Sequence, residues 1–445
     1  MSDLKGNQPE LWTRGFLGLQ LAQFMGAFND NLVKIVLMLM VASESGNLWA
    51  GDLGPGGQSY ISLLMTIPFL LLLDFSGRCA DRFSKRRIIF WVKVSEIPIS
   101  IIIAIGLIAG SIWLTLIGYA LLMMESAFFN PSKYGMIREV IMTRQLSRGN
   151  GLMNMTTNMA IILGTAVGGP LLGFGYWPVG AAIIIISIIG FLGVFVIPPL
   201  PAIKPTTALT PWPGASSIRT LLGMRTRHPV ESHQQIHAGH RYHPLLLITI
   251  LWAWFWFAAV LVTLIVPEYK GLLNVSDAAT SGMLALLGIA IGISCAAAGY
   301  ISGGRVRMSL IPFGAFGLAL FFLLLAVLPP SYWLAVFLLC LGGLSAGFYL
   351  VPLQALIQQA APNDMRAQYV SSSNWLCYLL MTIAAVVFKI ASTMNIQIGW
   401  IYGFCAVTMA LTLIPLILYR KLLCVAEGCG FDQPNILATS LTDSR

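Results

Sequence analysis

The sequence predicts an all-α membrane protein with twelve transmembrane helices in two halves of six. The first observation is composition: 57% of the 445 residues are hydrophobic and only 10% are charged, whereas a soluble domain usually carries about 25% charged residues. The second is a series of twelve apolar stretches, each near the ~20 residues that a helix needs to cross a bilayer. The third is a long polar stretch that separates the first six from the last six.

Each apolar stretch is predicted to be a helix, because an open strand would leave its backbone groups unpaired in lipid. The expected spans are 15–42, 59–77, 88–109, 111–130, 151–173, 178–198, 244–266, 277–301, 308–328, 331–360, 368–391 and 398–420. They divide the chain into a first six-helix half (1–200), a His-bearing linker (201–243), a second six-helix half (244–420) and a tail (421–445).

The positive charges predict the orientation of these spans. The formal net charge is +9, but all except four of the 26 Lys and Arg residues lie in segments that alternate spans place on one side. Three of the four, Lys34, Lys93 and Lys389, lie within or at the edge of spans, which leaves Lys270 alone in the opposite loops. Because positively charged loops stay in the cytoplasm, we expect both termini there and no nucleic-acid partner.

Four polar residues interrupt the middle of the first span: Asn29, Asp30, Asn31 and Lys34. A charge at that depth costs about 2.5–3.5 kcal/mol on insertion scales, so such a helix usually faces the bundle interior or a water-filled path. The run therefore predicts a substrate or ion site. The alternative is that Asp30 and Lys34, four residues apart on one helical face, simply neutralise each other.

Two further acidic residues lie at membrane depth. Glu96 in the third span stands three residues after Lys93, a spacing that predicts a local ion pair. Glu125 in the fourth span lies near the cytoplasmic mouth. Each is a candidate for a substrate or ion role, with a structural role as the alternative. Lys389 is expected to extend along its span to the outer interface.

No catalytic or cofactor motif is present. The chain has no nucleotide-binding P-loop, and no His is followed after four residues by the Asp of glycerolipid acyltransferases. The five histidines all lie in the linker among Pro, Ser and Gly, which favours a loop over a helical metal site. We therefore expect neither an enzyme nor a cofactor nor a metal site. These histidines are His228, His233, His237, His240 and His243.

The loop after the second span resembles the signature of the major facilitator superfamily, G-x-x-x-D-R-x-G-R-[RK]. It departs from the signature at Ser84, where Gly is usual, and at Lys85, where Arg is usual. The resemblance implies two six-helix halves related by an axis along the membrane normal and a conformational latch in which Asp81 caps a helix N-terminus and pairs with an Arg. The alternative is that these basic residues only set topology. The predicted latch consists of Gly77, Asp81, Arg82, Lys85, Arg86 and Arg305.

Several longer blocks resemble one branch of that superfamily, the bacterial lysophospholipid transporters. They include 23–34, the Asn-Pro-Ser-Lys-Tyr-Gly run at 130–135, and 347–358. The resemblance implies a secondary transporter that moves lysophospholipids, mainly lysophosphatidylethanolamine, from the outer to the inner leaflet of the bacterial inner membrane. There a separate acyltransferase would restore the second chain. Na⁺ and H⁺ are the candidate coupling ions. Asn154, where the family tends to carry Glu, and the long linker are departures.

The head group of such a lipid suggests roles for the polar run. Asp30 would pair with the ammonium and Lys34 with the phosphate, while Asn29 and Asn31 would add neutral hydrogen bonds. Two other functions stay open: a facilitator exporter of another amphiphile, such as a drug or siderophore, and a non-transporting scaffold whose linker recruits a partner. The candidate substrate or ion site comprises Asn29, Asp30, Asn31, Lys34, Glu125, Lys133 and Gln354.

Overall fold

The computed structural model describes residues 12–42, 53–141, 146–198, 214–226, 244–302, 307–360 and 366–418. Within these ranges the chain is helical apart from short connections, and 12 helices are long and apolar enough to cross a membrane. The predicted all-α class and the predicted number of spans are therefore confirmed. Their bounds agree with the expected ones to within a few residues at most ends, with α4 as the main exception.

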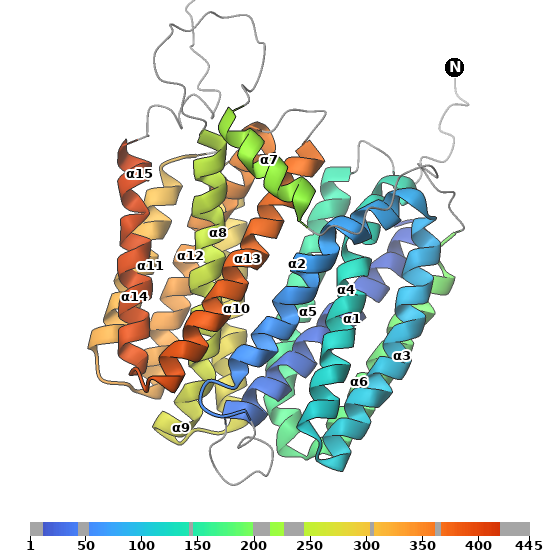
Figure 1. Cartoon of the computed structure of the whole chain (residues 1–445), viewed down its shortest axis with the longest axis horizontal. Coiled ribbons are helices and arrows are strands. Elements are labelled where there is room, and N and C mark those ends of the chain that lie inside the picture. The colour runs from blue at the N-terminus through green and yellow to red at the C-terminus, as the bar shows by residue number, and fades with distance from the viewer. Residues whose placement is uncertain are drawn as a thin grey trace, which may run out of the picture.

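The helices form two groups that lie side by side (Figure 1). The first half contains α1 (Arg14–Ala42), α2 (Gln58–Arg82), α3 (Lys85–Ala109), α4 (Ile112–Val140), α5 (Leu146–Gly173) and α6 (Tyr176–Phe195). The second half contains α8 (Pro244–Ile265), the 3-10 turn η2 (Val266–Glu268), α9 (Tyr269–Leu273), α10 (Asp277–Ser302), α11 (Leu310–Val327), α12 (Tyr332–Ala360), α13 (Arg366–Thr393), α14 (Ile398–Leu411) and α15 (Leu413–Leu418).

Two seams join the halves, one between α2 and α13 and one between α5 and α10. In the first seam Trp375 donates a hydrogen bond to the carbonyl of Leu70 at 3.1 Å. In the second, Gly169 lies so close to α10 that an added Cβ would be 2.3 Å from the carbonyl oxygen of Asp277. Small residues permit this close approach of helix backbones in a membrane protein.

The linker contains a helix that the sequence did not predict, α7 (Ala215–Thr226). Its buried Ser217 donates to Asp74 of α2 at 3.0 Å, and Gly214, just before it, lies against the Trp375 ring of α13. A helix this short is marginal alone and depends on such packing. We call the end of the bundle that carries α7 the linker end, and the opposite one the α9 end (Figure 1). The five histidines lie outside the described residues.

At the α9 end, side chains of one half bind the backbone of the other. Lys389 of α13 donates to the carbonyls of Leu53 and Pro55 at 2.9 and 2.8 Å, and its ammonium lies 4.7 Å from the Tyr60 ring centroid. Gln58 of α2 hydrogen-bonds to Glu268 and to the carbonyl of Leu264. Lys389 thus extends to the end of its span, as predicted, and its ammonium in addition links the two halves.

Candidate functional site

A buried cluster of charged and polar side chains lies within the first half, built from α1, α3 and α4. Lys93 and Glu96 of α3 are each 1% exposed, Asn29 of α1 is 0% exposed and Glu125 of α4 is 6% exposed. Charges removed from water to this degree are retained only where partners compensate for the lost hydration. The contacts within the cluster therefore show which of its polar atoms already have a partner and which could still bind a ligand.

Lys93 is the centre of the cluster. Its ammonium lies 2.5 Å from Glu96 Oε2 and 3.5 Å from Glu125 Oε1, and 4.7 Å from the centroid of the Phe129 ring. Gly26 of α1 leaves room for it, since an added Cβ would be 2.6 Å from Nζ. The predicted Lys93–Glu96 pair is confirmed. Its extension to Glu125 ties α3 to α4.

Asn29 occupies the other oxygen of Glu96. Its amide donates to Glu96 Oε1 at 3.1 Å and to Ser100 Oγ at 3.4 Å. Both oxygens of Glu96 are thus engaged, one by Lys93 and one by Asn29. The amide oxygen of Asn29 is buried and has no hydrogen-bond partner among the described residues, so this residue supplies an unused acceptor next to the ion pairs.

Asp30 is held differently from Glu96. Ser126 of α4 donates to its Oδ2 at 2.7 Å, while its Oδ1 is buried without a hydrogen-bond partner in the described part of the chain. Lys34 is half-buried and forms no ion pair with any described residue. The alternative in which Asp30 and Lys34 simply neutralise each other therefore does not hold in this structure.

Lys133 lies inside α4, because this helix continues to Val140. The expected end of the span at residue 130 was wrong: the side chain of Lys133 is buried, with its ammonium 5.0 Å from the Tyr134 ring centroid. It acts electrostatically on both Asp30 and Lys93. The hydroxyl of Tyr134 donates to Asn154 of α5 at 3.1 Å, which gives Asn154 a structural partner.

Two other predicted site residues stand apart from this cluster. The amide of Asn31 donates to the carbonyl of Ala27 in its own helix at 2.8 Å. Gln354 is exposed on α12 of the second half, and no contact between described residues joins it to the cluster. The structure thus brings together Asn29, Asp30 and Glu125, with Lys133 in electrostatic range.

The predicted latch is only partly assembled. Asp81 is exposed in the last turn of α2 and pairs with no described residue, and the N-cap position of α3 is Ser84. Lys85 is buried 2.5 Å from Glu139 of α4, and Arg86 donates to the carbonyl of Ile197 at 2.6 Å. Gly77 has open space around it, Arg82 lies 5.7 Å from the Phe83 ring centroid, and Arg305 lies outside the described residues.

Sequence reasoning missed three members of the cluster. The sequence predicts the Lys93–Glu96 ion pair, and the same spacing inside an apolar span could have identified Lys93 as a site residue. Ser126 and Tyr119 gave no signal, because hydroxyl residues are common in membrane helices. Tyr119 is buried, acts electrostatically with Asp30, and its hydroxyl has no hydrogen-bond partner among the described atoms.

The cluster therefore separates into two parts with different chemical capacity. The locked part is Lys93 with Glu96 and Glu125, two carboxylates that share its single positive charge. The available part is Asp30, with one oxygen that has no hydrogen-bond partner, and Lys133. Lys34 follows Asp30 by four residues on α1, and neither lysine forms an ion pair with a described carboxylate. A carboxylate and two ammonium groups with unused capacity suit a ligand that carries both signs of charge.

Comparisons with known proteins agree with the fold. The family profile of the Major Facilitator Superfamily matches residues 19–386. A protein named lysophospholipid transporter LplT from Cronobacter sakazakii is 28% identical over 375 residues, covering 82% of this chain and 86% of that protein. Its namesake from Enterobacter sp. (strain 638) is 27% identical over 362 residues, covering 80% and 83%.

Among solved structures, the crystal structure of a POT family transporter in complex with 5-aminolevulinic acid is similar with a TM-score of 0.72. It covers 92% of this chain and 96% of that chain at 13% sequence identity. This likeness supports the fold, and at such a low identity it carries no statement about the ligand.

Proposed function

The chain belongs to the Major Facilitator Superfamily, and we propose that it is a secondary transporter of lysophospholipids, with lysophosphatidylethanolamine-like lipids as substrates. It is a multi-pass membrane protein with twelve candidate spans. The relatives named lysophospholipid transporters match 80% or more of its length, which supports this substrate class. The observation that carries the proposal is the uncommitted carboxylate oxygen of Asp30 at the edge of a buried charge cluster.

A zwitterionic head group fits the available charges. Its ammonium would bind Asp30 Oδ1, which no described group occupies. Its phosphate would face the ammonium groups of Lys34 and Lys133, the latter already in electrostatic range of Asp30. Hydrogen bonds between ionised groups are about twice as strong as neutral ones. The head group would thereby gain partners for both of its charges while out of water.

The locked part of the cluster would keep the site in shape during transport. Lys93 holds Glu125 of α4 and Glu96 of α3 together, and Asn29 of α1 is bonded to Glu96. The two helices that carry the head-group ligands, α1 and α4, are therefore fixed relative to each other through α3. Pre-arranged charges lose little freedom when they bind a ligand, which favours affinity.

We place this activity in the bacterial inner membrane, with the linker end and both termini in the cytoplasm. Lysophospholipids would move from the outer to the inner leaflet, where a separate acyltransferase would restore the second chain. Na⁺ or H⁺ would drive the cycle, and the unused oxygens of Asn29 and Asp30 are the acceptors that such a cation would meet. The latch residue Asp81, exposed here, would pair with a basic residue when the linker end closes.

Uptake by the purified protein in liposomes tests the proposal. Labelled lysophosphatidylethanolamine is supplied outside, with and without a Na⁺ or H⁺ gradient, and we expect gradient-dependent uptake. The double variant Asp30→Lys with Lys34→Asp should abolish uptake while expression persists, because it places the wrong charge at each end of the head group. Absence of wild-type uptake under every gradient would contradict the proposal. Preserved uptake in the double variant would contradict the assigned site.

A further inference from the structure

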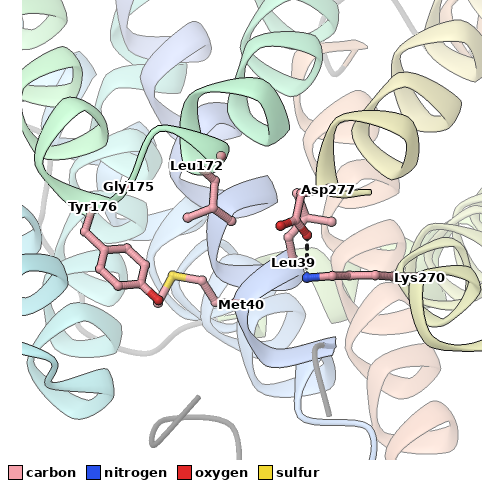
Figure 2. A pocket seen from close by; sticks show the side chains of 8 residues that line it. Leu39, Met40, Leu172, Gly175, Tyr176, Lys270 and Asp277 are labelled. Atoms are coloured by element: carbon pink, nitrogen blue, oxygen red, sulfur yellow. Dashed lines mark ion pairs between the residues drawn. The ribbon is translucent and has the colours of Figure 1, made fainter. Parts of the chain in front are cut away.

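A cavity of about 240 Å³ lies between the two halves at the α9 end, far along α1 from the buried cluster. Figure 2 shows Tyr176 on one side of it and the Lys270–Asp277 pair on the other, with Leu172 and Met40 between them. The first half thus supplies an apolar wall and a phenol, and the second half supplies both charges. Pockets that bind small molecules combine an apolar lining with a few placed polar groups in this way.

The two charges of the cavity are within reach of a ligand. Lys270 Nζ lies 2.6 Å from Asp277 Oδ1, and the side chains are 19% and 24% exposed. An ion pair in this partly exposed setting contributes little to stability. Lys270 and Asp277 can therefore give up their contact with each other and bind a ligand that carries one positive and one negative charge.

Large aromatic side chains are exposed at the end of the bundle that holds the cavity. The residues on either side of Gly175 and Tyr176, Phe174 and Trp177, are 80% and 69% exposed. Trp333 and Trp400, each near the start of a span at the same end, are 76% and 73% exposed. Exposed Trp residues that ring one end of a helical bundle are typical of the interface between hydrocarbon and water. An amphiphile can reach this position from the membrane.

We propose that this cavity is an entry site that captures the head group of a zwitterionic lysophospholipid before it reaches the buried cluster. The proposal rests on the proposed function and adds a second site to it. Lys270 binds the phosphate, Asp277 binds the ammonium, and the chain lies along the apolar wall. Two of the helices that line the cavity, α5 and α10, form the seam that holds the halves together here. A bound head group therefore lies at the place where the halves must separate during transport.

Single substitutions of the two charges separate ligand binding from a structural ion pair. Asp277→Asn should raise the KM for lysophosphatidylethanolamine by about tenfold and leave lysophosphatidylglycerol, which has no ammonium, unaffected. Lys270→Gln should raise the KM for both lipids. A pair that is merely structural would make the two variants respond alike towards both lipids, and that result would overturn the proposal. Wild-type uptake in the same assay reports on the proposed function separately.

Filling the cavity provides a test that leaves the charges in place. Gly173 lines it and has no atom within 4 Å of an added Cβ, so Gly173→Leu should fit and raise the KM about tenfold. Gly271 of α9 is equally unobstructed and lies outside the lining, so Gly271→Leu is the matched control and should behave as wild type. An unchanged KM in Gly173→Leu would overturn the proposal.

Competition identifies the source of the head group. Lysophosphatidylethanolamine should compete for wild-type uptake far better than glycerophosphoethanolamine, which lacks the chain, or inorganic phosphate. This preference should shrink in Gly173→Leu, because the chain loses its path along the wall. Equal inhibition by phosphate would identify an anion site without lipid recognition and would overturn the proposal.

Discussion

The two halves share one helical plan but bury different chemistry. The first half buries the charged side chains of Lys93, Glu96, Glu125 and Lys133 at membrane depth. In the described part of the second half no charged side chain is buried, and the buried hydrogen-bonding side chains include Ser, Thr and Tyr residues. Ser294 of α10 is typical, since it bonds to the backbone of Gly343 and Gly347 in α12 and so serves helix packing.

This difference separates two tasks. Buried charge is expensive in a membrane and is retained mainly where it handles a polar substrate or ion. The second half contains the Ser and Thr bonds of a packed bundle, and it reaches across the α9 end through Lys389. The first half would therefore bind the head group at membrane depth. The second half would move against it and offer apolar surface to the chain, and its own pair of charges, Lys270 and Asp277, lies at the α9 end.

The largest expected effect is that of Lys93→Met, which removes the cation that two buried carboxylates share. Removing one partner of a buried ion pair costs about 3–5 kcal/mol, so we expect a large drop in the thermal unfolding midpoint in detergent and loss of uptake. Lys34→Met is the matched control, because Lys34 forms no ion pair with a described residue, and it should keep its unfolding midpoint.

A second substitution sharpens this result. Adding Glu96→Gln to Lys93→Met removes the nearest orphaned charge while keeping an acceptor for the amide of Asn29. The unfolding midpoint of the double variant should recover in part. If the double variant is less stable than Lys93→Met alone, the ion pairs described here do not stabilise the cluster. The contrast between a first half with buried ion pairs and a second half without them would then have no energetic basis.

Asp30→Asn should separate function from folding. The amide oxygen can still accept the hydrogen bond from Ser126, so the unfolding midpoint should change little. Uptake of lysophosphatidylethanolamine should fall at least about tenfold, because the loss of a charge-assisted hydrogen bond costs about 1.5–3 kcal/mol. Full uptake by Asp30→Asn would show that the available charges of the first half do not bind the head group.

The sequence predicted the helices well because spans depend on local apolar length, which bilayer thickness fixes. It also located Asp30 and the Lys93–Glu96 pair, since charges inside apolar runs are conspicuous. It could not predict that Lys93 reaches Glu125, that Asp30 bonds to Ser126 instead of Lys34, or that Lys389 binds Leu53 and Pro55. These contacts join residues distant in sequence, and only the packing of helices determines them. The α7 helix escaped prediction for the same reason.

A smaller effect is expected in the second half. Ser294→Ala removes the hydroxyl that joins α10 to α12 and should cost about 1 kcal/mol, as a typical hydrogen bond does. It should lower the unfolding midpoint slightly and leave the ratio of lysophosphatidylethanolamine to lysophosphatidylglycerol uptake unchanged. A change in that ratio would assign head-group recognition at membrane depth to the second half and break the comparison.

The smallest effect is expected for Asn31→Ala. This variant tests whether an uncharged polar side chain on α1 contributes to head-group binding. The amide of Asn31 is already bonded to the carbonyl of Ala27, and Ala is the better helix former. Stability and uptake should both stay within about 0.5 kcal/mol of wild type. A tenfold loss of uptake with an unchanged unfolding midpoint would instead return Asn31 to the head-group site that its position beside Asp30 suggests. Recognition would then depend on neutral hydrogen bonds as well as on buried charge.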